Sequence, residues 1–257
     1  MTKNPNTQLL INSSKILSGI SDVYNTHWFN VTKLIPDGYF DYVVDDVPYG
    51  LNVGKMPFLK ANVQVLQKNG KTLNPNKNKK YSLKEWDLQP PGQDYFDEMK
   101  RISKHQIIFG VEYVDWVGLG TGRIKWNKGV ANGMSFKDYE MAYCSSINHT
   151  HEINLLWSGM MQAESLQNPM KQQGNKKLNE IRIHPCQKPV LLYKKIALDF
   201  DLKNKKVFCG HNGSGSDRIA FYNFCEQFIA TEIDKEHFND QEKRYINFKS
   251  QHSLQLL

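Results

Sequence analysis

Short apolar runs alternate with stretches of helical periodicity through most of this chain, and this alternation limits its possible folds more than any other feature. Runs of β-branched and aromatic residues predict strands, and apolar residues that recur every three or four positions predict helices. We expect strands near residues 42–44, 105–110, 123–127, 139–146, 205–210 and 228–234, and helices near 93–104, 188–200, 218–224 and 236–250. This order predicts one α/β domain with a largely parallel sheet and helices on both faces.

The composition bears on the partner and the compartment. A net charge of +7 and a pI near 9.0 suit a polyanionic partner, because Lys and Arg side chains near phosphates release condensed counterions. Charge alone leaves nucleic-acid binding open, since many basic proteins bind none. The four cysteines form no CxxC pair, which argues against a zinc site or disulfide framework and fits a reducing cytoplasm. We expect no membrane span, because no run approaches about 20 apolar residues, and no secretory signal.

The first chemical motif is Asp46-Val47-Pro48-Tyr49, at the end of an apolar strand. The exocyclic amine of a nucleobase is a poor nucleophile, because its lone pair is delocalised into the ring. A carboxylate and a backbone carbonyl that each accept an amine hydrogen localise this lone pair, and a proline keeps the acceptors rigid. An aromatic ring directly afterwards offers a stacking face for a base swung out of a duplex. Taken alone, such a tetrapeptide is more often an ordinary turn.

The second motif is a glycine-rich turn between a predicted strand and a predicted helix, VFCGHNGSGSDRIA at residues 207–220. Such a turn lets a ligand approach the backbone closely. The next strand ends in Glu232 and Asp234, where an acid is well placed to accept both hydroxyls of a ribose. The pattern predicts a site for an adenosine-type ligand. A dinucleotide cofactor would give the same pattern, and a surface turn is an equal alternative.

A third motif, RIHPCQKPVLLY at residues 182–193, opens a helix. Backbone amides at the helix start, with His184 and Lys188 beside them, can hold a carboxylate. By itself this stretch is only the beginning of a helix.

The three motifs in this order resemble the permuted β group of DNA amino-methyltransferases, in which the catalytic motif precedes the cofactor motif. The family patterns DPPYG, HPTQKP, DxxxGSGS and EID are represented here by DVPYG, HPCQKP, CGHNGSGS and TEID. The resemblance extends from about residue 24 to residue 247, and the small phage and prophage enzymes are the most similar.

This resemblance implies a Rossmann-like fold that uses S-adenosylmethionine, with an antiparallel hairpin at one edge of the sheet. It implies direct transfer of the sulfonium methyl group to the amine of a flipped-out adenine in double-stranded DNA, without a metal. Asp46 and the carbonyl of Val47 would bind the amine, Pro48 would keep the loop rigid, and Tyr49 would stack on the base. The residues implied at the cofactor are His184, Lys188, Cys209, His211, Gly213, Ser214, Gly215, Glu232 and Asp234.

Three positions depart from the family patterns. Val47 stands where proline is usual, Cys209 where aspartate is usual and Cys186 where threonine is usual. Val47 keeps its carbonyl but removes one rigid link, and Cys209 removes a carboxylate from the cofactor loop. Two alternatives therefore stay open. One is a weakened or inactive descendant that binds DNA or serves as a partner subunit, and the other is an enzyme that acts on the exocyclic amine of cytosine.

Two irregular basic stretches, near residues 52–81 and 162–182, are expected to recognise the target sequence, because no separate recognition domain fits in 257 residues. The expected DNA contacts are Lys68, Lys71, Lys77, Lys79, Lys80, Lys171, Lys176, Lys177 and Arg182. We treat residues 1–22 as an N-terminal extension and residues 23–257 as one methyltransferase domain. A homodimer, a partner subunit and a role in restriction–modification stay open. The expected location is the cytoplasm or the nucleoid, within the host cell if the gene belongs to a phage.

Overall fold

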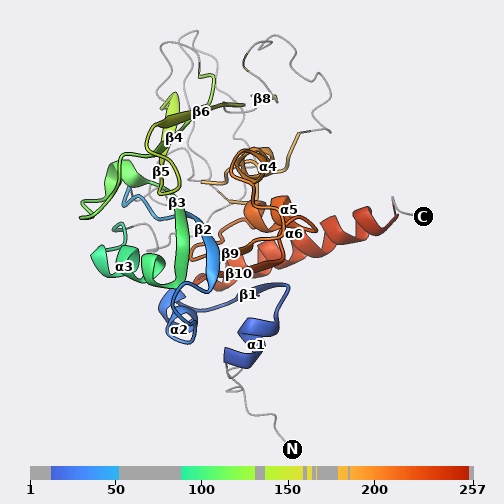
Figure 1. Cartoon of the computed structure of the whole chain (residues 1–257). Helices are drawn as coiled ribbons and strands as arrows, with labels where there is room; N and C mark the ends of the chain where they lie inside the picture. The colour runs from blue at the N-terminus through green and yellow to red at the C-terminus, as the bar shows by residue number, and fades with distance from the viewer. Residues whose placement is uncertain are drawn as a thin grey trace, which may run out of the picture.

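A computed structural model of the chain describes residues 13–51, 88–130, 137–158, 161–163, 166, 179–184 and 186–254. Within these residues, eight strands form one sheet in the order β1-β10-β9-β2-β3-β5-β4-β6 (Figure 1). The strands are β1 (Ser21–Tyr24), β2 (Phe40–Asp46), β3 (Ser103–Phe109), β4 (Arg123–Asn127), β5 (Tyr139–Cys144), β6 (Thr150–Asn154), β9 (Lys206–Cys209) and β10 (Gln227–Thr231). A separate antiparallel pair consists of β7 (Leu156–Ser158) and β8 (Met161–Ala163).

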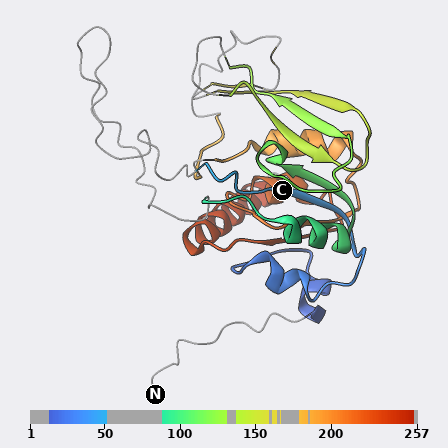
Figure 2. The same cartoon turned by 90° about the vertical axis from the view of Figure 1, so that its left-hand side faces the viewer.

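One strand, β5, runs against all the others in the main sheet. Neighbouring strands from β1 to β3 are all parallel. Strand β5 runs antiparallel to both β3 and β4, and β6 continues the sheet parallel to β4. Figure 2 shows the sheet from β1 near the bottom to β4, β5 and β6 at the top. The expected, largely parallel sheet with an antiparallel hairpin towards one edge is confirmed.

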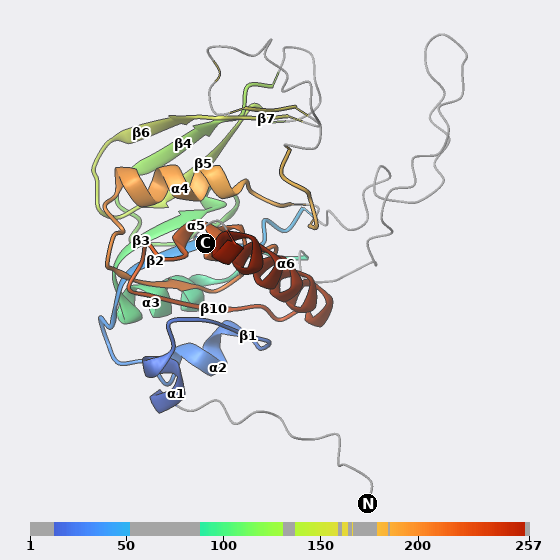
Figure 3. The ribbon, with the colours of Figure 1, turned by 90° about the vertical axis from the view of Figure 1, so that its right-hand side faces the viewer.

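Helices cover both faces of the sheet. One face carries α1 (Ser13–Ser18), α2 (Trp28–Thr32) and α3 (Gln93–Ile102). The other carries α4 (Val190–Asp199), α5 (Ser216–Phe221) and α6 (Lys235–Leu254), which lie in front of the sheet in Figure 3. Because successive side chains of a strand point to opposite faces, Val207 and Cys209 of β9 pack with α4 and α5, whereas Phe208 packs with the helices opposite. The expected Rossmann-like, doubly wound α/β fold is therefore confirmed.

The N-terminal boundary of the fold differs from the expected one. Strand β1 begins at Ser21 and pairs with β10, and Ile16 in α1 is fully buried in the core. Residues 13–22 therefore pack as part of the domain rather than extending from it. A strand of four residues and a helix of six are too short to produce a periodic signal in the sequence.

Two strand ends also differ from their predicted positions, and both differences lie beside the motifs. Strand β2 runs on to Asp46, because Asp45 and Asp46 pair with Ile108 and Phe109 of β3. Strand β10 ends at Thr231, so Glu232 and Asp234 follow the strand rather than belong to it. In addition, α5 begins at Ser216, two residues before its predicted start, and α6 extends to Leu254.

The strand order reverses direction between β9 and β2. From β2 the chain proceeds to β3 on one side, and from β9 it proceeds to β10 on the other. In open α/β sheets, ligands bind beyond the carboxyl ends of the strands at such a switch point. The loops after β2, β9 and β10 all lie at this edge. Across the described residues, no helix is long and apolar enough to span a membrane.

Candidate active site

The motif after β2 packs against a buried group of charges. Lys188 lies just before α4 and is 5% exposed. Its ammonium group forms an ion pair with Asp46 and another, 3.0 Å long, with Glu140 of β5. Lys128 lies 2.9 Å from the other carboxylate oxygen of Glu140. Two carboxylates and two ammonium groups are thus balanced beside the end of β2.

Burial and neighbouring charges set the protonation of this group. Burial raises the pKa of Asp46 above its usual value, with Lys188 opposing the rise and Glu140 adding to it. For Glu140, Lys188 and Lys128 outweigh burial and lower the pKa to about 2. Burial alone would lower the pKa of Lys188, but Asp46 and Glu140 outweigh burial and raise it. Glu140 and Lys188 are therefore charged at neutral pH, and Asp46 is the carboxylate more easily protonated.

Tyr49 connects the loop after β2 to the same charges. Its hydroxyl lies 3.0 Å from Asp46 Oδ1 and 3.1 Å from Glu140 Oε2, and it accepts a hydrogen bond of 2.9 Å from Lys188 Nζ. The Tyr49 ring stacks on Tyr113, with centroids 4.7 Å apart and planes 14° from parallel. A side chain at Gly110 would place Cβ 2.5 Å from the Tyr49 ring, so the ring needs a glycine there. Val47 is buried beneath this loop.

The glycine-rich loop after β9 is joined to the end of β10 by Glu232. Its carboxylate accepts hydrogen bonds of 2.8 Å from the backbone N–H groups of Gly213 and Asp234. Gly213 has a φ of 53°, a conformation that favours glycine. A Cβ built there would have His211 O, at 4.0 Å, as its nearest described neighbour outside the adjoining residues. The backbone at Gly213 is therefore open to a ligand, with a carboxylate beside it, and fits an adenosine-type group.

Asp45 connects the two motif loops, and sequence reasoning did not single it out. It is fully buried, and its carboxylate accepts hydrogen bonds from the N–H groups of Gly210 at 3.1 Å and His211 at 3.0 Å. The Nδ1 atom of His211 lies 2.9 Å away, and the hydroxyl of Tyr95 makes a further short contact. The adjacent acids in FDYVVDDVPYG are the available signal, but the motif pattern gives a role only to the second.

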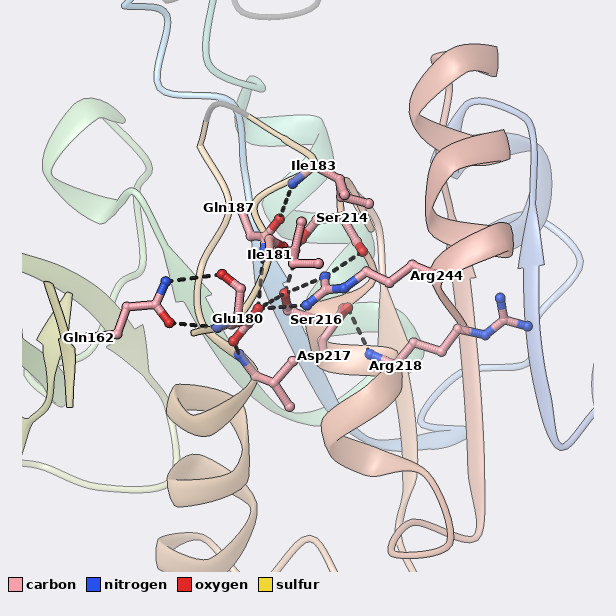
Figure 4. Close-up of polar contacts among 11 residues, drawn as sticks. Gln162, Glu180, Ile181, Ile183, Gln187, Ser214, Ser216, Asp217, Arg218 and Arg244 are labelled. Carbon is pink, nitrogen blue, oxygen red and sulfur yellow. Dashed lines mark hydrogen bonds and ion pairs between the residues drawn. The ribbon is translucent and has the colours of Figure 1, made fainter. Parts of the chain in front are cut away.

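A second polar cluster, also missed from the sequence, lies between the HPCQKP stretch, the glycine loop and α6 (Figure 4). Glu180 Oε1 lies 2.6 Å from Arg244 Nη2 and accepts a hydrogen bond of 2.8 Å from Gln187 Nε2. Arg244 Nη1 donates to the carbonyl of Ser214 at 2.8 Å and lies 3.0 Å from Ser216 Oγ. The side chain of Gln162 binds both backbone groups of Glu180. Residues far apart in sequence thus hold one side of the glycine loop.

The remaining predicted residues divide between the described and the undescribed parts of the chain. The rings of His184 and His237 are 4.3 Å apart, and Cys209 is buried at the end of β9 with its sulfur 3.4 Å from Asp45 Oδ1. Arg182 stacks over Trp157 at 4.3 Å. The expected DNA-contacting lysines, which are Lys68, Lys71, Lys77, Lys79, Lys80, Lys171, Lys176 and Lys177, fall outside the described residues. Most of both basic stretches, and residues 1–12 of the expected extension, also fall outside them.

Comparison with known proteins yields structural neighbours alone. No family model and no curated protein sequence matches the chain. The structure of M1.HpyAVI in complex with SAM matches with a TM-score of 0.47 and 17% identity, over 87% of this chain and 98% of that one. The cytosine-N4-specific PvuII DNA methyltransferase matches with a TM-score of 0.49 and 14% identity, over 88% and 86%. At these TM-scores and identities, neither neighbour's ligand nor its activity is carried over to this chain.

Proposed function

We propose that this chain is a DNA methyltransferase that transfers a methyl group from S-adenosylmethionine to the exocyclic amine of adenine in double-stranded DNA. One observation carries the proposal. Asp46 ends β2 at the switch point of the sheet, and the carbonyl of Val47 and the Tyr49 ring follow it. Strand β9, beside β2, leads into an open glycine loop joined to Glu232. An acceptor pair for an amine and a loop suited to an adenosine-type ligand therefore face the same edge.

The proposed chemistry assigns one task to each group. S-Adenosylmethionine supplies an electrophilic methyl group on a sulfonium. Asp46 and the carbonyl of Val47 accept the two amine hydrogens, which localises the lone pair on nitrogen. In a direct transfer the N–C bond would form as the S–C bond breaks, with S-adenosylhomocysteine as the leaving group. The amine proton held by Asp46 would pass to that carboxylate and then to solvent, and no bond would form to the protein. Tyr49 stacks on the flipped base, and its phenol stays protonated because burial, Asp46 and Glu140 raise its pKa.

The cofactor side of the proposal uses the loop after β9. Glu232 accepts the ribose hydroxyls with the lone pairs left by its two amide partners, and Gly213, Ser214 and Gly215 give the ligand access to the backbone. His184, His211 and Asp234 lie in or beside this region. Lys188 is held by Asp46 and Glu140, so we assign it to the base-binding side rather than to the cofactor.

The test is transfer of labelled methyl from S-adenosylmethionine to mixed genomic DNA, followed by nucleoside analysis. We expect label in N6-methyladenine. Label in N4-methylcytosine would assign the same geometry to cytosine. Cofactor binding without transfer to any DNA would favour the descendant that only binds DNA or serves as a partner subunit.

Asp46→Ala should lower the rate of methyl transfer by about a hundredfold or more. The Kd for S-adenosylmethionine should stay within about twofold, because Asp46 is assigned to the amine and not to the cofactor. Asp41→Asn, at the opposite end of the same strand, is the matched control and should keep transfer. Retained transfer in Asp46→Ala would overturn the assignment.

A further inference from the structure

The buried carboxylate of Asp45 accepts hydrogen bonds from several groups, at the end of β2 and at the start of the glycine loop. Besides the N–H groups of Gly210 and His211, it accepts the N–H of Asp46 at 2.8 Å. One buried carboxylate therefore fixes the backbone at the start of the glycine loop and at the proposed amine acceptor. A buried charge is costly unless it is fully hydrogen-bonded, and this one is.

The strand register explains why Asp45 can reach the glycine loop. Tyr42 pairs with Val207 and Val43 with Phe208, so two positions further along the parallel pair Asp45 lies beside Gly210. In the family that the sequence resembles, the carboxylate at this loop stands on the strand that leads into it, at the position of Cys209. Here Cys209 brings a thiol whose pKa burial raises well above its usual value, so the thiol stays neutral and donates to Asp45.

We infer that Asp45 is the positioning residue of the cofactor loop, and that the carboxylate absent from residue 209 is supplied across the sheet by β2. The inference rests on the proposed function and deepens it. Asp45 acts through Gly210 and His211, whose backbone leads into Gly213, and it does not touch the cofactor itself. The loop therefore keeps a carboxylate, supplied by another strand, although Cys209 has none.

The protonation of the pair agrees with this arrangement. Burial alone would raise the pKa of Asp45, but the charge and hydrogen bonds of His211, with the hydroxyl of Tyr95, outweigh burial and lower it. Burial alone would lower the pKa of His211, but Asp45 outweighs burial and raises it. A carboxylate of lowered pKa and an imidazole of raised pKa thus stabilise each other.

The test measures the Kd for S-adenosylmethionine by calorimetry, without DNA. Asp45→Asn is nearly isosteric but loses the charge and one acceptor, so its Kd should rise about tenfold or more. The double variant Asp45→Asn with Cys209→Asp should regain most of the affinity, because the carboxylate returns on β9. Asp41→Asn, the same substitution at the other end of β2, is the matched control and should bind within about threefold of the wild type.

A second variant perturbs the same carboxylate without changing any polar group. A Cβ at Gly210 would come within 2.7 Å of Asp45 Oδ2, so Gly210→Ala should also weaken binding if Asp45→Asn fails to fold. Wild-type affinity in a folded Asp45→Asn, or in Gly210→Ala, overturns the inference. So does an Asp45→Asn defect that Cys209→Asp leaves unrepaired. A wild-type chain that binds no S-adenosylmethionine overturns the proposed function instead.

Discussion

Lys188 forms an ion pair with the proposed amine acceptor, Asp46, and shares its charge with a second acid, Glu140. Asp46 and Glu140 both bind its ammonium group, with Lys128 on the far oxygen of Glu140 and the Tyr49 hydroxyl between the acids. Without Lys188, Asp46 would face the charge of Glu140 unopposed. Burial raises the pKa of Asp46, and the lysine opposes that rise, so it favours the ionised carboxylate that accepts hydrogen bonds from an amine.

Lys188→Met should therefore raise the pKa of Asp46. As the pH is lowered, the variant should lose transfer activity at a higher pH than the wild type does. We expect the acidic limb of the pH–kcat profile to move upwards by about one to three units, with little change in the Kd for S-adenosylmethionine. Adding Glu140→Gln should move the acidic limb back to lower pH, because the negative charge of Glu140 no longer raises the pKa of Asp46. If the limb stays in place and cofactor affinity falls instead, Lys188 binds the cofactor, as the sequence resemblance implied.

Asp217 provides a pH-dependent test of stability. It is buried at the start of α5 and hydrogen-bonded to Asn212 Nδ2 and the N–H of Arg218, and burial raises its pKa to about 6. The folded state therefore holds a proton that the unfolded state has lost, and stability falls as pH rises from about 4 to about 6.

Asp217→Asn removes this loss and keeps an acceptor for Arg218. Urea unfolding should show a variant about 2–3 kcal/mol more stable than the wild type at pH 7.5 and no more stable at pH 3.5. Exposed Asp115→Asn serves as the control and should be neutral at both. A gain that is equal at the two pH values would show that the Asp217 proton plays no part.

At the scale of elements, the Glu180–Arg244 cluster connects α6 and the stretch before α4 to the glycine loop through hydrogen bonds and an ion pair.

Arg244→Met would leave Glu180 charged, partly buried and without its guanidinium partner. It would also remove a hydrogen bond to the carbonyl of Ser214. We expect a loss of about 2–4 kcal/mol in unfolding free energy, by urea denaturation, and weaker cofactor binding. Adding Glu180→Gln should recover part of the stability. Lys243→Met, one position earlier on α6, is the control. Equal stability of Arg244→Met and Lys243→Met would contradict this role.

The elements that the sequence predicts well are those with a local signal. Strand β9 and helix α3 carry apolar periodicity, and the motifs around Asp46 and Gly213 combine strand ends with turn residues. Contacts made across the sheet have no such signal. Asp45 and Glu140 act through residues on other strands, and Arg244 appears as one more basic residue on a polar helix. The base-side role proposed for Lys188 has no local signal either, because the partners of Lys188 come from β2 and β5.

At the scale of the whole molecule, the net charge of +7 and the basic stretches bear on DNA affinity. Changing Lys77, Lys79 and Lys80 together to Gln should weaken binding to all sequences alike. The slope of log K against log salt should become shallower by about two to three, since each phosphate contact adds about 0.9. Fluorescence anisotropy over a salt series measures the slope, and the Kd for S-adenosylmethionine should not change. An unchanged slope would place the phosphate contacts elsewhere.

The pairing of β1 with β10 joins the beginning of the described chain to a strand near its end. Ser21 lies opposite Phe228, so β1 has no sheet neighbour until residues 227–231 have been made. At about 5–20 residues per second, the ribosome needs roughly ten to forty seconds to synthesise the intervening segment. Through that interval, Ile16 and the apolar side of α2 lack the part of their core that Phe208 of β9 and Ile229 of β10 supply. The main sheet therefore cannot be completed before β10 has been made, and β1 joins it only after nearly the whole described chain has been synthesised.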